Sequence, residues 1–425
     1  MAAAPVLAQP QPTGAPAQAR SSGALTLAQA LQAARGNLDV AIARGGLAAA
    51  RADVVAADRA PLPVLSGKLA SMDLQHGLGG GSLWSEKRID KSIGVDWTWE
   101  RGNKRALRTQ TAQRAADAAQ ADLEDVTVLQ LQATHGAYFD LLAAQERLAQ
   151  VTALERSAAQ LAATAGRRVQ AGDLAAQDAM RTEIEAQRAR ADLQAAQLER
   201  QRAALALRQL TGLEAPVDGL QAAADWPALE LAPGDAASLA QARPDVRAAQ
   251  ARLQAAQSAL DGAQALKRAD VTWGASVDHF PGTSTRLLEL RAQMPLQWGY
   301  DYQGEIGRAQ AQLAQARDAQ DKVLRAATAE MQRLQLEAQG SAQRARGYEA
   351  DILPRARRVA DGAELAYGKG ALSLTDLLDA RRTLRATQLE ALAARTEAAK
   401  AVGAWQLRAQ PELFLNTSSS TESTQ

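Results

Sequence analysis

The stretch YGKGALSLTDLLDARRTL, residues Tyr367–Leu384, places two glycines inside an otherwise helix-forming sequence. Glycine readily adopts the left-handed conformation that ends many helices, so Gly370 predicts a tight turn between two helices. Asp376 and Asp379 follow three residues apart and are therefore expected on one face of the second helix. The surrounding chain is rich in Ala, Gln, Arg and Leu and poor in proline, which predicts long helices or coiled coil.

The composition excludes several classes of function. The 425 residues include 48 basic and 47 acidic side chains, and a net charge of +1 gives no bulk attraction for nucleic acid. The absence of cysteine excludes disulfides, thiolate metal sites and cysteine nucleophiles. No zinc-protease, phosphate-loop or nucleophile-elbow motif occurs. We therefore predict no enzyme, no resident metal and no cofactor.

Proline-free segments indicate where long helices can run, because an interior proline costs about 3 kcal/mol. Residues 104–166 contain no proline and have leucines at helical spacing, and a helix of that length spans roughly 90–100 Å. The triplet AGD at 171–173 then predicts a helix end followed by an N-cap at Asp173. A second helix is expected to run to about Leu210.

Two regions alternate with a period of two, which is typical of β-strands. In residues 92–100, large apolar residues alternate with small or polar ones, and residues 271–278 repeat the pattern. Residues 64–74 and 286–294 can supply partners across glycine-containing loops. The sequence therefore predicts two β-hairpins, and five of the seven tryptophans lie in or beside them.

The order helix, hairpin, long helix, turn, helix occurs twice, which predicts an internal duplication. Residues 1–22 are expected to be a flexible segment that could be the remnant of a signal peptide, and 410–425 a flexible tail. The first repeat is placed at 23–212, with its hairpin at about 62–100 and its turn at about 166–173. A linker at 213–235 leads to the second repeat at 236–409, with its hairpin at about 269–298 and its turn at about 367–372.

Four motifs carry a family resemblance. They are LTLAQAL at 25–31, NKR at 103–105, ILPRARRVADGAELAYGKG at 352–370, and the Y-x-x-G-x-x-S-x-x-D-L-L-D-A-R-x-T-L run at 367–384. Across residues 25–407 the chain resembles the TolC family of outer-membrane efflux channels, especially the heavy-metal and related factors that work with resistance–nodulation–division pumps. The resemblance implies a mainly α homotrimer whose long helical hairpins form a periplasmic tunnel. Each protomer would contribute four strands to a shared 12-stranded membrane β-barrel.

Physical arguments agree with this resemblance. Two hairpins cannot close a barrel, and an open sheet edge is not tolerated in lipid, so neighbouring copies are required. Tryptophans near strand ends suit a membrane interface. The resemblance further implies the outer membrane of a Gram-negative bacterium as the location, and outer-membrane lipid, a periplasmic adaptor (membrane fusion) protein and an inner-membrane pump as partners. Metal cations or drugs would be the exported substrates.

The resemblance also assigns functional residues. The two turns would be the tips that dock the adaptor, and Asp376 and Asp379 occupy the positions of the periplasmic gate. In a trimer each aspartate would form a ring of three carboxylates, which favours cations. Taken alone, the two acids favour a solvated helix face on which acids near the N-terminus are stabilised by the helix dipole. The docking tips comprise Ala171, Gly172, Asp173, Leu174, Gly370, Ala371, Leu372 and Ser373.

Other readings stay open from the residues alone. Arg381 and Arg382 could be closing contacts of the gate or ordinary surface charges. A channel for type I protein secretion would share the architecture, whereas a soluble helical scaffold would leave the aromatic hairpins unexplained. The histidines are interpreted as surface residues rather than metal ligands, and they are His76, His135 and His279.

Overall fold

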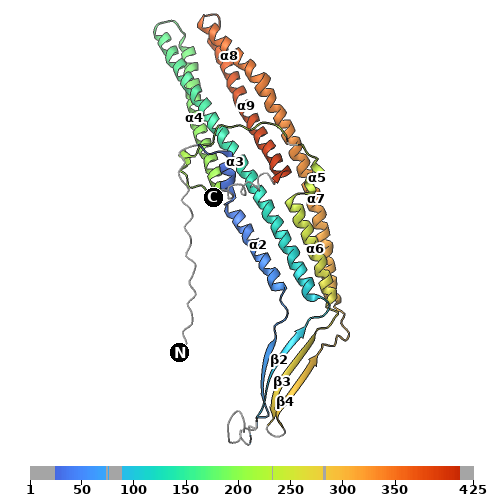
Figure 1. The fold of residues 1–425 in the computed structure, drawn as a ribbon. Helices are drawn as coiled ribbons and strands as arrows, with labels where there is room; N and C mark the ends of the chain where they lie inside the picture. The colour runs from blue at the N-terminus through green and yellow to red at the C-terminus, as the bar shows by residue number, and fades with distance from the viewer. Residues whose placement is uncertain (1–23, 73–74, 76–88, 232, 281–283, 412–425) are drawn as a thin grey trace, which may run out of the picture.

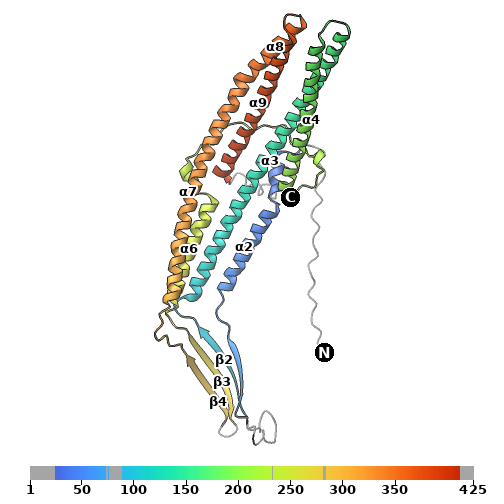
Figure 2. The same cartoon turned by 180° about the vertical axis from the view of Figure 1, so that it is seen from behind.

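The computed structural model describes residues 24–72, 75, 89–231, 233–280 and 284–411. The molecule is elongated, with a β-sheet at one end and the turns of two helical hairpins at the other (Figure 1). The same arrangement is seen from behind, where the two hairpins separate toward their turns (Figure 2). The predicted class, mainly helical with four strands, is confirmed.

The first hairpin is built on one continuous helix. Helix α3 (Lys104–Gln170) has 67 residues, which corresponds to about 100 Å. Helix α4 (Ala176–Thr211) packs along it. Near the middle of α3, Leu131, Tyr138 and Leu141 are almost fully buried. The helix predicted from leucine spacing is therefore confirmed, and its apolar face forms the core.

The second hairpin is interrupted. Helix α7 (Gln303–Gly347) passes through one π-helical turn (Tyr348–Ile352) into α8 (Leu353–Gly368), and α9 (Leu374–Ala409) returns. Pro354 lies in the first turn of α8. Proline lacks an N–H, and its ring clashes with the carbonyl four residues earlier, so the local wider turn has a direct cause. The two halves of the chain differ at this point.

Shorter elements pack on the long helices, some at their middle and others between the middle and the sheet (Figure 1). They are α1 (Leu27–Ala34), α2 (Leu38–Ala57), a 3-10 turn (Val217–Gly219), α5 (Ala236–Gln241) and α6 (Pro244–Ala265). Leu25 pairs with Ala222 in an isolated parallel bridge. The hydroxyl of Tyr138 donates to the carbonyls of Leu25 and Ala223, both at 3.2 Å. The start of the first half is thereby fixed to the segment that follows α4.

The two predicted hairpins are confirmed and join into one antiparallel sheet. The strands β1 (Val64–Ala70), β2 (Asp90–Trp99), β3 (Val271–Phe280) and β4 (Ser284–Gln293) follow the order β1-β2-β3-β4. Strands β2 and β3 connect the two halves, with Trp97 opposite Trp273 and Thr98 opposite Thr272. The two threonine hydroxyls lie 3.0 Å apart.

The sheet has one apolar and one polar face. Large apolar side chains on one face are 47–77% exposed, and they are Ile93, Val95, Trp97, Trp99, Trp273, Val277, Leu288 and Leu290. On the other face, Arg291 forms an ion pair with Asp96 at 2.6 Å. The pair spans Gly274, where an added Cβ would lie 3.0 Å from Arg291 Nη2 and closer still to Asp96. The lack of a side chain at Gly274 therefore makes room for the pair.

Candidate gate, docking turns and membrane face

The two hairpin turns have the same geometry. Gly172 and Gly370 both have positive φ, 84° and 75°. Each turn closes with a backbone bond to the residue five earlier, Asp173 N to Arg168 O at 2.8 Å and Ala371 N to Ala366 O at 2.9 Å. No atom lies within 4 Å of an ideal Cβ at either glycine, so the backbone conformation, and not space, requires glycine.

One detail of the predicted first turn is wrong. Asp173 is not the N-cap of α4, which starts after Ala175 without a side-chain cap. The amide of Asp173 instead closes the turn, because a wider loop separates the two helices. Most of the predicted docking residues are exposed, whereas Leu174 and Leu372 are half-buried. Both turns lie at the end of the molecule far from the sheet (Figure 1).

Asp376 and Asp379 lie together at the start of α9. Ser373 is the N-cap: its Oγ accepts from the Asp376 amide at 3.2 Å and donates to the Asp376 carboxylate at 2.6 Å. Leu377 and Leu378 are buried, whereas both aspartates are exposed. Within the described residues neither carboxylate lies within ion-pair distance of a cation. Asp376 therefore has a capping role in the single chain, and the charge of Asp379 acts on Arg382 of the same helix without a contact at ion-pair distance.

Long arginine side chains connect the two hairpins near the turns. Arg382 of α9 forms an ion pair with Glu185 of α4, and Arg385 forms another with Asp192. The hydrogen bond to Glu185 is the main cause that raises the pKa of Arg382 above its usual value. Arg381 is different, because it binds Glu364 of α8 at 2.8 Å within its own hairpin. Of the two predicted candidates, only Arg382 therefore lies between the hairpins.

The first half does not reproduce the acidic pair. Asp178 and Arg181 stand where the second half has two aspartates, and they approach each other to 3.8 Å. Arg181 Nη1 also donates to the hydroxyl of Thr375 at 3.2 Å, beside Asp376. The first hairpin thus presents a cation to the second at the level of the candidate gate.

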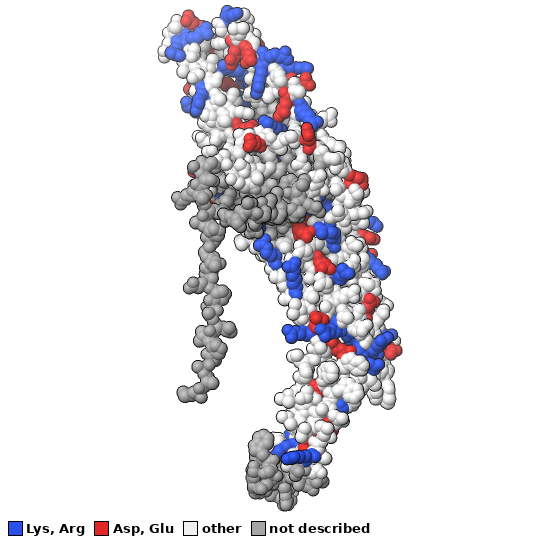
Figure 3. Space-filling model, viewed as in Figure 1, with Lys and Arg blue, Asp and Glu red and all other residues white. Residues whose placement is uncertain are grey.

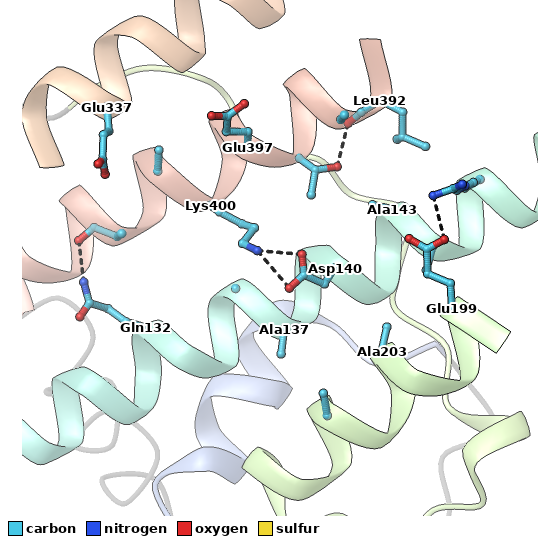
Figure 4. Close-up of a pocket in the computed structure, with 18 of the residues that line it drawn as sticks. Gln132, Ala137, Asp140, Ala143, Glu199, Ala203, Glu337, Leu392, Glu397 and Lys400 are labelled. Carbon is cyan, nitrogen blue, oxygen red and sulfur yellow. Dashed lines mark hydrogen bonds and ion pairs between the residues drawn. The ribbon is translucent and has the colours of Figure 1, made fainter. Parts of the chain in front are cut away.

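A groove lies between the hairpins near the middle of the helices (Figure 4). Its volume is about 990 Å³, and alanines from α3, α4 and α9 line it. Lys400 binds Asp140 at 2.8 Å across it, and Arg147 binds Glu199 at 2.8 Å. These charges neutralise one another in pairs. In the part of the chain that the structure describes, no group of three or more metal-ligating side chains occurs, here or elsewhere.

His135 is buried, so its prediction as a surface residue is wrong. It is 7% exposed, and its ring packs on Phe139 and over Gly403. Burial, with a smaller effect of the Lys400 charge, lowers the pKa of His135 to about 4. Helical spacing from Leu131 and Tyr138 could have identified this position as internal. His279 is half-buried, and His76 lies outside the described residues.

The surface separates into two regions. Acidic and basic side chains cover the helical part and become sparse over the sheet (Figure 3). Among the described residues, no helix has the length and apolarity needed to cross a membrane. On the strands, an apolar face that carries Trp97, Trp99 and Trp273 is exposed.

Comparisons with known proteins agree with this architecture. Residues 29–213 match the family described as outer membrane efflux protein. Cobalt-zinc-cadmium resistance protein CzcC of Cupriavidus metallidurans is 27% identical over 295 residues, covering 67% of this chain and 68% of that protein. The solved outer membrane protein VceC of Vibrio cholerae matches with a TM-score of 0.74 at 18% identity, over 90% of this chain and 95% of that one. The CmeC outer membrane channel of Campylobacter jejuni matches with a TM-score of 0.74 at 15% identity, over 95% and 93%.

The family match covers residues 29–213, and the fold matches extend over nearly the whole chain. This family and fold are those of channels and not of enzymes. The location that follows is the outer membrane, with the helices extending into the periplasm. The chain thus resembles outer membrane efflux proteins in sequence over residues 29–213 and in fold over nearly its whole length, and this supports an outer-membrane exit duct of a tripartite efflux system.

Proposed function

We propose that three copies of this chain form a duct that carries metal cations out of the cell. The observation that carries the proposal is the two-faced sheet at the end of long polar helices. Strands β1 and β4 each have one edge without a partner in the sheet of the single chain. Three copies joined edge to edge would pair β4 of one with β1 of the next and close a 12-stranded barrel.

The faces of the sheet set the orientation of this barrel. The apolar face would contact outer-membrane lipid, and the polar face with the Arg291–Asp96 pair would line the lumen. The helices would then extend into the periplasm and present both turns at their far end. Small exposed residues such as Ala171 and Ala371 allow close approach of another helical hairpin. This end would dock a periplasmic adaptor, which connects the duct to an inner-membrane resistance–nodulation–division pump.

The exposed aspartates of α9 would form the gate. Around a three-fold axis, Asp376 and Asp379 each become a ring of three carboxylates. Three carboxylates at about 6 Å separation repel by roughly 3 kcal/mol per pair at an effective dielectric constant near 20. Cations that enter the ring relieve this repulsion. The Arg382–Glu185 and Arg385–Asp192 pairs would hold the second hairpin against the first while the gate is closed.

Two observations support metal cations as the substrate. The related protein CzcC is named for cobalt, zinc and cadmium resistance. The candidate gate is acidic and, within the described residues, unpaired. Without a clustered ligand set in the described residues, the wall would pass cations rather than hold them. Selection of the metal would then belong to the pump.

To test the proposal, the chain is expressed with its pump and adaptor in a strain that lacks its own outer-membrane efflux channel. We expect restored growth in cobalt, zinc or cadmium salts. Light scattering of the purified chain in detergent should give the mass of a trimer. A matched strain with the pump and adaptor alone is the control. A folded monomer in detergent would contradict the assembly, and export of drugs or proteins without metal tolerance would contradict the substrate.

A further inference from the structure

The junction between the sheet and the helices brings together side chains from both halves of the chain. The amide of Arg101 donates to Asp270 at 2.9 Å, which places the end of β2 beside the start of β3. An ideal Cβ at Gly102 would lie 3.0 Å from Arg268 Cδ, so that side chain covers the β2–α3 turn. Gln297 Nε2 donates to the carbonyl of Leu266 at 3.1 Å. Arg101, Lys267 and Arg268 therefore lie in one place, named here the junction cluster.

Each cation of the junction cluster is exposed. Within the described residues, none of the three has a carboxylate at ion-pair distance. The nearby acids are already neutralised: Asp270 binds Lys104 at 2.8 Å, and Glu100 binds Arg108 at 3.0 Å. Asp301 is the one exposed carboxylate of the β4–α7 connection. The cluster therefore retains a positive charge that the rest of this junction does not cancel.

Aromatic side chains border the junction cluster on the sheet side. Trp99 is 56% exposed on the apolar face, two residues before Arg101. Trp298 is 87% exposed, and its neighbour Gln297 binds the residue before Lys267. Basic side chains are visible at the level where the helices meet the sheet (Figure 3). An indole beside a long cationic side chain fits the boundary between acyl chains and headgroups, where the ring lies in the interface and the cation extends toward phosphate.

We infer that the junction cluster binds the phosphate of anionic phospholipid headgroups in the membrane leaflet next to the helices. The inference rests on the proposed orientation of the sheet in lipid, and it adds the chemical class of that lipid. A zwitterionic headgroup carries its own cation and gains little from three further positive charges. An anionic headgroup gains roughly fivefold in local binding for each nearby cation. Three cations without a carboxylate at ion-pair distance therefore favour the negatively charged headgroup of phosphatidylglycerol over the zwitterionic headgroup of phosphatidylcholine.

The test uses the tryptophans as reporters. The full chain is reconstituted into vesicles of dioleoyl phosphatidylcholine that also contain phosphatidylglycerol. In one sample a fixed fraction of the lipid is brominated phosphatidylcholine, and in the other the same fraction is brominated phosphatidylglycerol. Brominated acyl chains quench indole fluorescence on contact. We expect the parent protein to prefer the brominated anionic lipid at least about threefold. The triple variant Arg101→Gln, Lys267→Gln, Arg268→Gln should lower that preference to near unity.

A matched triple variant controls for loss of charge elsewhere. Arg325→Gln, Arg357→Gln, Arg358→Gln removes three exposed cations from α7 and α8, far from the sheet, and should keep the parent preference. Equal preference in the parent and the junction variant would overturn the inference. Loss of the preference on adding free inorganic phosphate at constant ionic strength would also overturn it, because the cluster would then recognise phosphate in solution. Failure of both brominated lipids to quench the parent would instead contradict the membrane orientation of the sheet.

Discussion

Replacing Gly403 by alanine tests the packing of α9 against α3. A Cβ at this position would lie within 2.7 Å of three ring atoms of His135, closer than real Cβ atoms come. The ring is 7% exposed and packs on Phe139 at 4.8 Å between centroids, so it has little room to move. The imidazole must leave its site or the helices must separate.

The magnitude follows from two opposing terms. Overpacking a filled core costs about 1–3 kcal/mol, and a fully displaced ring lies at the upper end of that range. Alanine in a helix interior gains about 1 kcal/mol over glycine. We expect the free energy of unfolding of Gly403→Ala to fall by about 1–2 kcal/mol. Gly340→Ala, in the interior of α7 with no atom within 4 Å of the added Cβ, should instead be neutral or stabilised.

The assay is denaturant unfolding in detergent, followed by far-ultraviolet circular dichroism at one protein concentration, because assembly makes the midpoint depend on concentration. The double variant Gly403→Ala, His135→Ala should recover at least about 1 kcal/mol relative to the sum of the single variants, since the clash is gone. If Gly403→Ala were as stable as Gly340→Ala, the close packing of His135 on Gly403 would be refuted.

Three further predictions concern pH, the gate and the docking turn. Because burial lowers the pKa of His135 to about 4 from 6.5, the unfolded chain takes up the proton first. The contribution of neutral His135 to the free energy of unfolding is therefore complete above about pH 6.5, and up to about 3 kcal/mol is lost as the pH falls toward 4. The variant His135→Gln should show a smaller change in the free energy of unfolding over this pH range. Asp376→Asn with Asp379→Asn should weaken block by a trivalent cation about tenfold or more in planar bilayers, and unchanged block would make both acids ordinary surface charges. Gly370→Val forces a β-branched residue into positive φ, so at equal membrane insertion it should abolish metal tolerance, and retained tolerance would show that this turn is not needed.

Sequence periodicity predicted the helices and strands because the spacing of apolar residues along one element is a local pattern. The spacing of α3 leucines and the alternation in β2 and β3 need no knowledge of the partner. Contacts between distant segments were not predictable in the same way. The Arg382–Glu185 pair joins different halves, and nothing in its local sequence separates Arg382 from Arg381, which binds within its own hairpin. His135 was wrongly predicted to be exposed because its side chain is polar. Its helical spacing from the apolar residues Leu131 and Tyr138 indicates a buried position instead.

The π-helical turn at Tyr348–Ile352 makes the two halves of the chain mechanically different. Helix α3 is an unbroken rod, whereas α7 and α8 meet at a joint in which the regular ladder of backbone bonds is disturbed. In a three-fold assembly, continuous α3 helices would alternate around the tunnel with α7–α8 helices that are interrupted by the π-helical turn. A force across the tunnel at the hairpin turns would then bend the three α7–α8 helices at the same place. The end of the tunnel would widen symmetrically while the sheet end stays fixed. Amide hydrogen exchange across the joint should accordingly be faster than at the middle of α3, and equal rates would show that both walls are equally rigid.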